Sequence, residues 1–235
     1  MSGSTDASFR ERTVLLAGAT GELGAVVAQK LLSSGARLAI AVRRPWQVEA
    51  IKTRFGRGVL VGVVPATDAE AAAGFVKGLQ DALGPLDALI VTLGAFAVAE
   101  VGKDRSDLAA QLVEANYLAP ATLARAVVPP MRRRKSGAIV LTGARAVGSA
   151  LPGMAQYLAS KAALHAFGSC LHSELAPLGI HVAIVAPPAL DTVVNRKVPV
   201  NAPLMALDRV ADALLLGALG RLPGPPPLYP LDIQG

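Results

Sequence analysis

The stretch Thr13-Val-Leu-Leu-Ala-Gly-Ala-Thr-Gly-Glu-Leu-Gly24 decides the fold of this chain. An apolar run ends in three glycines, Gly18, Gly21 and Gly24, and a helical pattern of apolar residues follows at once. Glycine suits this turn because the backbone must adopt unusual dihedral angles, approach a pyrophosphate and let the strand pack closely on the helix. The helix N-terminus then offers unpaired N–H groups and a positive dipole end. The stretch therefore indicates the first strand–turn–helix unit of a dinucleotide-binding fold.

Length and composition bound the class of protein. The 235 residues suit a single α/β domain, with residues 1–12 interpreted as a flexible leader and 13–235 as the dinucleotide-binding domain. The apolar content of 52% predicts a sheet covered on both faces, because no apolar run is long enough to span a membrane. One cysteine, Cys170, excludes an internal disulfide and fits the cytoplasm; we expect it to be buried in a helix.

The net charge of +6 raises nucleic acid as a partner, but the aromatic content of 4% leaves few stacking platforms. The densest basic run, 132–135, falls where a long helix should end and so pairs with the helix dipole. We therefore expect neither a nucleic-acid partner nor a membrane. No His/Cys cluster has metal-ligand spacing, so no metal is expected.

Strand-like and helix-like segments alternate along the chain. The predicted strands are 13–17, 37–42, 59–64, 88–93, 138–142, 180–186 and 228–233. Beyond the helix that follows Gly24, helices are predicted at 68–83, 105–134 (bent near Pro120), 153–175 and 207–219. Residues 187–205 read as proline-rich and irregular. This alternation predicts one doubly wound Rossmann-type domain: a parallel seven-stranded sheet in the order 3-2-1-4-5-6-7 with helices on both faces.

The tip of the second strand carries Arg43 and Arg44 and no acid. An acidic residue there binds the free ribose 2′-hydroxyl of NAD, whereas arginine accommodates the 2′-phosphate of NADP. The pair therefore favours NADP over NAD, mainly through Arg43. The alternative is an ordinary solvated strand end.

Tyr157 and Lys161 lie four residues apart in a predicted helix and so share one face. A nearby ammonium lowers the pKa of a phenol, which would let Tyr157 exchange a proton at working pH. On an exposed helix such a pair is more often solvated surface.

Several blocks in order make the chain resemble the short-chain dehydrogenase/reductase superfamily, from Thr13 to Gly235. The glycine spacing is similar to that of extended or atypical members. The blocks are Gly18-Ala-Thr-Gly21-Glu-Leu-Gly24, Leu86-Asp-Ala-Leu-Ile-Val91 before Gly94, Asn116, Gly137-Ala-Ile-Val140, Tyr157-Leu-Ala-Ser-Lys161 and Ala186-Pro187-Pro188-Ala-Leu-Asp191-Thr192.

The resemblance implies hydride transfer between NADP(H) and a small carbonyl or alcohol substrate. Tyr157 would exchange the proton, Lys161 would bind the nicotinamide ribose, and Asn116 would hold a water in a proton relay. It also implies a homodimer or homotetramer. The residues it assigns to cofactor binding are Gly18, Thr20, Gly21, Glu22, Leu23, Gly24, Arg43, Arg44, Gly94, Lys161, Pro187 and Thr192.

Departures from the family pattern affect the substrate side, which comprises Ala144, Ser149 and Asp191. Thirteen residues before Tyr157, where the family has a serine, stands Ala144, which has no hydroxyl; Thr142 or Ser149 would have to replace it. Pro65 and Val91 stand where the family often has Asp and Asn. These losses favour the alternative of a weakly catalytic or non-catalytic NADP-binding sensor or structural subunit.

His165 and the pair Arg196 and Lys197 each have two possible roles. His165 lies two turns from Tyr157 and could reach the site, although a helix-packing role is the expectation. Arg196 and Lys197 could meet an acidic substrate or face water. The substrate itself and the direction of the reaction do not follow from the sequence.

Overall fold

A parallel sheet of seven strands in the order β3-β2-β1-β4-β5-β6-β7 forms the centre of the molecule. The computed structural model describes residues 9–197 and 203–232. The strands are β1 Thr13–Ala17, β2 Arg37–Val42, β3 Leu60–Val63, β4 Leu86–Val91, β5 Gly137–Thr142, β6 Ile180–Ala186 and β7 Leu228–Pro230. The predicted fold class and strand order are thus confirmed.

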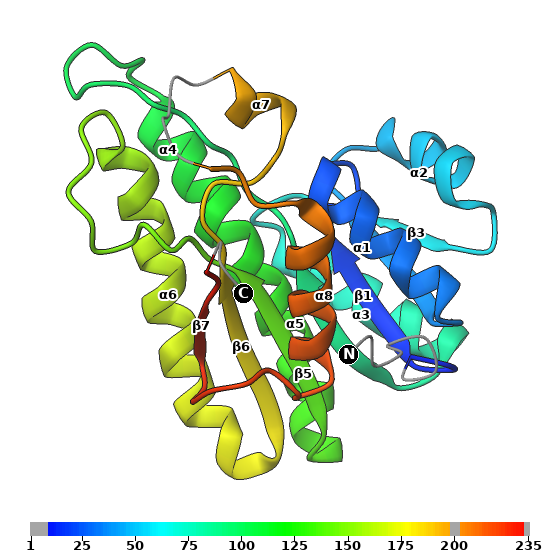
Figure 1. Ribbon diagram of the computed structural model, residues 1–235. Helices are drawn as coiled ribbons and strands as arrows, with labels where there is room; N and C mark the ends of the chain where they lie inside the picture. The colour runs from blue at the N-terminus through cyan, green and yellow to red at the C-terminus, as the bar shows by residue number, and fades with distance from the viewer. Residues whose placement is uncertain (1–8, 198–202, 233–235) are drawn as a thin grey trace.

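Helices cover both faces of this sheet (Figure 1). The larger ones are α1 Glu22–Ser33, α2 Gln47–Phe55, α3 Ala69–Leu83, α5 Ala119–Arg134, α6 Ala155–Leu175 and α8 Leu207–Ala218. Shorter ones are α4 Leu108–Val113, the π-helix η2 Glu114–Leu118, the 3₁₀ turn η3 Ala176–Leu178 and α7 Val193–Arg196. No helix in the described ranges has the length and apolar character needed to cross a bilayer.

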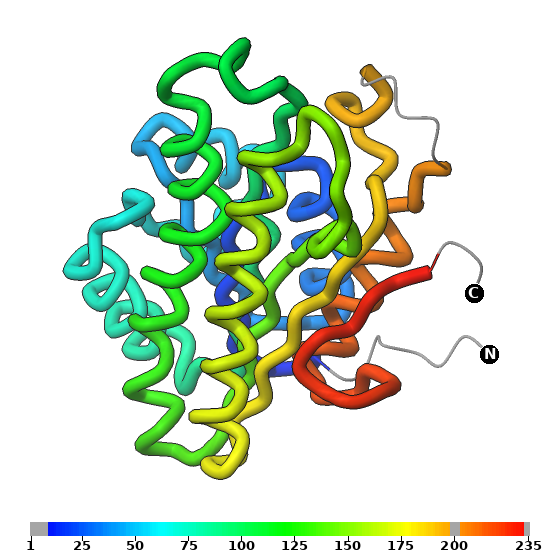
Figure 2. Tube along the Cα trace, turned by 90° about the vertical axis from the view of Figure 1, so that its left-hand side faces the viewer, coloured from blue at the N-terminus to red at the C-terminus, as the bar shows by residue number. Residues whose placement is uncertain are grey.

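The alternation of side chains along β1 divides the core into two layers. Val14 and Leu16 pack with residues of α1 and α8, whereas Leu15 and Ala17 pack with residues of α3, α5 and α6. All of β1 is buried, as its unbroken apolar run predicts. Figure 2 shows α3, α5 and α6 together on one side of the sheet.

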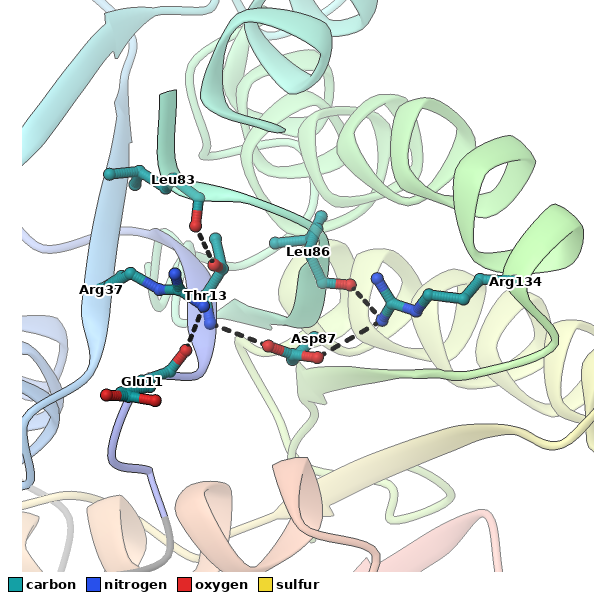
Figure 3. A network of polar contacts seen from close by, with 7 residues as sticks. All are labelled: Glu11, Thr13, Arg37, Leu83, Leu86, Asp87 and Arg134. Carbon is teal, nitrogen blue, oxygen red and sulfur yellow. Dashed lines mark hydrogen bonds and ion pairs between the residues drawn. The ribbon is translucent and has the colours of Figure 1, made fainter. Parts of the chain in front are cut away.

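A polar network ties the strands together at their amino ends, away from the glycine turn (Figure 3). The Asp87 carboxylate accepts from the Thr13 N–H at 2.8 Å and from Arg134, and Arg134 also donates to the Leu86 carbonyl at 2.7 Å. The basic run at 132–135 thus ends α5 as expected, and Arg134 additionally fixes β4.

The structure differs from the predicted elements in several places. The third strand is Leu60–Val63 rather than 59–64, the last is Leu228–Pro230 rather than 228–233, and α7 lies in the segment predicted to be irregular. The fourth strand is Leu86–Val91 rather than 88–93, and α2 had no predicted counterpart. The long helix is interrupted by the π-helix at Glu114–Leu118, just before Pro120, which lies in the first turn of α5. Proline lacks an N–H and clashes with the carbonyl four residues earlier, and a π-turn relieves that clash.

Residues 9–12, expected to belong to a leader, form a turn whose Phe9 side chain is fully buried. Residues 1–8, and Ile233 of the predicted last strand, lie outside the described residues.

Candidate active site

The glycine turn is packed so closely that side chains do not fit. A Cβ on Gly24 would lie 2.1 Å from the Gly18 carbonyl oxygen, and one on Gly18 would lie 2.4 Å from the Thr92 hydroxyl. Gly18 also has φ of +104°. The Thr92 hydroxyl donates to the Ala17 carbonyl at 3.0 Å. Thr92 thus joins β1 to β4, next to Val91, which stands where the family often has Asn. The turn leaves bare backbone at the start of α1, as a pyrophosphate seat requires.

Glu22, the first residue of α1, reaches across to another loop. Its carboxylate accepts from the Val193 N–H at 3.0 Å, at the start of α7. Thr192 caps the same helix by accepting from the Asn195 N–H. Of the other predicted cofactor residues in the turn, Leu23 is buried and Thr20 is exposed.

The tip of β2 presents both predicted arginines at the surface. The Gln47 side chain accepts from the N–H groups of Arg43 and Arg44, which shapes this turn. The Arg43 guanidinium lies 3.5 Å from the Glu114 carboxylate, at the start of the π-helix. The Arg44 guanidinium has no ion-pair partner among residues 9–197 and 203–232.

An apolar hollow lies beside Arg43, between the carboxyl ends of neighbouring strands. It is lined by Ala17, Ala41, Val42, Val64, Pro65, Ala66, Leu93, Ala119 and Leu123. The carboxyl ends on either side of the first strand are where a doubly wound sheet receives its ligand.

Tyr157, Lys161 and His165 lie at successive four-residue steps on α6 and so share one face. Lys161 is only 4% exposed, and its ammonium donates to the Thr142 carbonyl at 2.9 Å. A Cβ placed on Gly94 would lie 3.4 Å from the Lys161 nitrogen and 3.2 Å from the Asn116 amide oxygen. Lys161 of α6 and Asn116 of the π-helix therefore meet beside Gly94.

Burial sets the protonation of this face. It raises the pKa of Tyr157 to about 12 and lowers the pKa of Lys161 to about 8. We had expected the ammonium to lower the pKa of the phenol, and that expectation is wrong here because desolvation penalises the phenolate. At neutral pH, Tyr157 is a protonated phenol that can donate.

Asn116 is buried and held by three hydrogen bonds. Its amide exchanges two bonds of 2.9 Å with the backbone of Ala95 and donates to the Ser160 hydroxyl at 2.9 Å. Ser160 in turn donates to the Tyr157 carbonyl. The π-helix thus fixes the loop after β4 against the turn of α6 that carries Tyr157.

The structure shows where the two candidate substitutes for the serine missing at Ala144 lie. The Thr142 hydroxyl donates to the Val91 carbonyl at 2.8 Å, and Ser149 lies in an exposed turn. The His165 imidazole does more than pack, because its Nε2 accepts from the Ala144 N–H at 3.2 Å. Burial and the nearby Lys161 charge lower the pKa of His165 to about 4, which keeps it a neutral acceptor.

The segment after β6 borders the site. The Pro187 carbonyl accepts from the Arg145 N–H, and Asp191 forms an ion pair with Arg196. That pairing satisfies the Arg196 charge that had been considered for an acidic substrate. Residues 198–202 of the predicted proline-rich segment lie outside the described residues.

Sequence reasoning missed Phe96, whose ring meets the Tyr157 ring edge-on at a centroid distance of 4.9 Å. No signal in the sequence marks it, because the contact depends on the path of the loop after β4. Cys170, expected to be buried, is exposed on α6. Within the described ranges, no three His, Cys, Asp or Glu side chains gather where a metal ion could be held.

Comparisons with known proteins show the family to which the chain belongs. A family model described as "short chain dehydrogenase" matches residues 12–202. Dehydrogenase/reductase SDR family member 7B of Bos taurus is 29% identical over 79% of this chain and 60% of its own length. A short chain dehydrogenase of Pseudocercospora fijiensis is 30% identical over 72% of this chain and 56% of its own length. The chain thus spans less than two thirds of either relative.

A solved structure gives the same comparison in three dimensions. The short chain dehydrogenase of Burkholderia cenocepacia in complex with NADP has 27% identity and a TM-score of 0.80, and the match covers 95% of this chain and 90% of that one.

Proposed function

This chain belongs to the short-chain dehydrogenase family, and from that premise we propose that it is an NADP-preferring oxidoreductase. It would transfer hydride between the nicotinamide and a small carbonyl or alcohol substrate. The observation that carries this proposal is that Lys161 and Asn116 meet beside Gly94, with Tyr157 four residues before Lys161 on the same face of α6.

The residues present fit a phosphorylated dinucleotide. The bare turn at Gly18, Gly21 and Gly24 leaves backbone open for the pyrophosphate, and the small apolar hollow beside Arg43 lies at the strand ends where the adenosine end would bind. Arg43 and Arg44 would hold the 2′-phosphate. The remaining contacts are proposed for Thr20, Glu22, Leu23, Gly94, Lys161, Pro187 and Thr192.

The bound cofactor supplies the hydride or accepts it. In the reducing direction Tyr157, protonated at neutral pH, donates its proton to the substrate oxygen. Lys161 would hold the nicotinamide ribose. Asn116 would hold the relay water through a remaining acceptor site, because its side-chain amide already bonds Ala95 and Ser160. Ala144 has no side-chain donor. Tyr157 would therefore donate to the substrate oxygen without a second donor from position 144.

The choice between NADP and NAD is tested by titrating both reduced cofactors in parallel. Arg43→Ala should weaken NADPH binding by about tenfold, because a charge-assisted contact to the 2′-phosphate is lost, and leave NADH unchanged. Glu49→Gln, on the nearby α2, is the control and should change neither constant. Equal losses for both cofactors in Arg43→Ala would refute the role of Arg43.

A second candidate is a cofactor-binding sensor or structural subunit with little catalysis. Ala144 favours it, because loss of one polar stabiliser of a substrate oxygen typically costs about 10²–10³ in rate. The Phe96 ring against Tyr157 favours it as well. Turnover with the Tyr157→Phe comparison described in the Discussion separates the two.

We also propose a homodimer or homotetramer that works in the cytoplasm. We place the proposed contact between copies on the outer face of α5 and α6, which carries a hollow of about 270 Å³ that Cys170 helps to line. The single cysteine supports a reducing compartment.

A further inference from the structure

Large apolar side chains are exposed mainly at one end of the molecule. Among the described residues, eight large hydrophobic side chains are exposed. Five of them lie in the segments that follow β4, β5 and β6: Val98, Val101 and Leu151 in loops, and Val193 and Val194 in α7. Such a concentration marks a binding surface, because scattered exposed apolar residues are ordinary but clustered ones are not.

These loops border the Tyr157 face of α6. The Ala99 N–H donates to the Gly153 carbonyl at 2.8 Å, which joins the loop after β4 to the loop before α6. Phe96, in the same loop, contacts the Tyr157 ring. Glu22 ties the start of α7 to the glycine turn. Figures 1 and 2 both show the two loops and α7 at the same end of the sheet.

We call the loops after β4 and β5, together with the segment after β6 that includes α7, the rim. Most charged side chains of the rim form ion pairs with nearby charged side chains. Glu100 pairs with Lys103 and Arg105 with Asp107, all within the loop after β4. The other two ion pairs of the rim are Arg145–Asp232 and Asp191–Arg196. Among the described residues of these loops, Lys197 is the one cation without an acidic partner. The rim therefore offers no cluster of charge for an anionic substrate.

Apolar character continues from the rim towards the phenol. The Phe96 ring contacts the Tyr157 ring edge-on. Ala144, which stands in place of the missing serine, presents a methyl group and is 6% exposed. A polar or charged group bound here would lose its hydration without gaining a partner, which costs binding free energy. An alkyl or aromatic group has no such polar hydration to lose, and its burial is favourable.

From this rim we infer that the substrate is an uncharged carbonyl compound or alcohol with an extended apolar body. That body lies on Val98, Val101, Leu151, Val193 and Val194 while the reacting carbon faces Tyr157. The inference rests on the proposed oxidoreductase function, which it narrows to a substrate class.

Binding of methyl ketones of increasing chain length to the protein saturated with NADP⁺ tests the inference without requiring turnover. We expect affinity, measured by calorimetry, to rise about two- to fourfold with each added methylene. The same ketones ended by a distal carboxylate should bind at least about tenfold more weakly, because that charge would be desolvated unpaired. An affinity that does not change with chain length, or tighter binding of the ketones that carry a carboxylate, would overturn the inference.

Variants assign the effect to the rim. Val101→Ser and Val194→Ser replace side chains that are 68% and 53% exposed, so folding should not suffer, and each should flatten the dependence on chain length. Leu228→Ser, exposed on β7 outside these loops, is the matched control and should leave the series unchanged. A change of sedimentation in Val101→Ser with unchanged ketone affinity would place the rim in a contact between copies and overturn the inference.

NADPH oxidation with the same ketones keeps the two proposals apart. Ketones that bind with the predicted chain-length dependence but are not reduced support the apolar site and refute the oxidoreductase. Reduction at rates indifferent to chain length and charge supports the oxidoreductase and refutes the apolar site.

Discussion

At the residue scale, the buried ammonium of Lys161 is the most unusual group in the site. Burial lowers its pKa to about 8 from 10.5 in the unfolded chain, so the folded protein bears the cost of a desolvated charge below pH 8. As pH rises from 8 to 10.5 the folded state releases this proton before the unfolded state does. Since the unfolded state then binds more protons, stability should increase with pH in this window.

Comparison with Lys161→Met isolates that effect. Between pH 8 and 10.5 the free energy of unfolding of the unmodified protein should rise relative to Lys161→Met by up to roughly 3 kcal/mol. Urea denaturation at several pH values measures it. A difference between the two proteins that does not change with pH would mean that Lys161 is hydrated.

The sequence could predict that Tyr157 and Lys161 share a helix face, because a spacing of four residues is a local property. It could not predict the direction in which the pKa of Tyr157 moves, because that depends on burial by distant segments. The fate of Thr142 is also non-local. Its hydroxyl donates to Val91, which pairing with β5 brings alongside through the Val91–Leu141 register.

At the element scale, the β1–turn–α1 unit depends on backbone contact. A Cβ at Gly24 would meet the Gly18 carbonyl, which is backbone and has no rotamer that relieves the clash. Gly24→Ala should therefore lower the free energy of unfolding by roughly 1–3 kcal/mol and weaken NADPH and NADH alike.

Gly78→Ala is the matched control for that substitution. Gly78 lies inside α3 and a Cβ there would meet nothing within 4 Å, so alanine should stabilise the protein by roughly 0.5–1 kcal/mol. Thermal denaturation and cofactor titration of both variants give the comparison. If Gly24→Ala proves as harmless as Gly78→Ala, the close packing of the turn is wrong.

The strand–turn–helix signals predicted this unit and the sheet order because they are strong over short stretches. The sequence did not indicate α2, since only Ile51 of that helix is buried and its apolar pattern is therefore weak. The π-helix before Pro120 also escaped prediction. Proline announces a distortion, but the surrounding packing decides its form.

At the scale of the whole molecule, the outer face of α5 and α6 is where we propose that two copies meet. If two copies meet there, Cys170→Arg should dissociate the oligomer, because it places a charge in the contact. Ala73→Arg, at an exposed position of α3, should not. Sedimentation velocity of both variants tests this, and an oligomer that persists in Cys170→Arg would move the contact elsewhere.

The central claim is that Tyr157 delivers a proton in a reaction driven by NADPH. Single-turnover oxidation of NADPH with a panel of carbonyl compounds, compared between this protein and Tyr157→Phe, tests it most directly. We predict that the phenylalanine variant binds NADPH normally and reacts at least about 10²-fold more slowly. Equal rates, or two equally inert proteins that both bind NADPH, would contradict the claim and leave a cofactor-binding module.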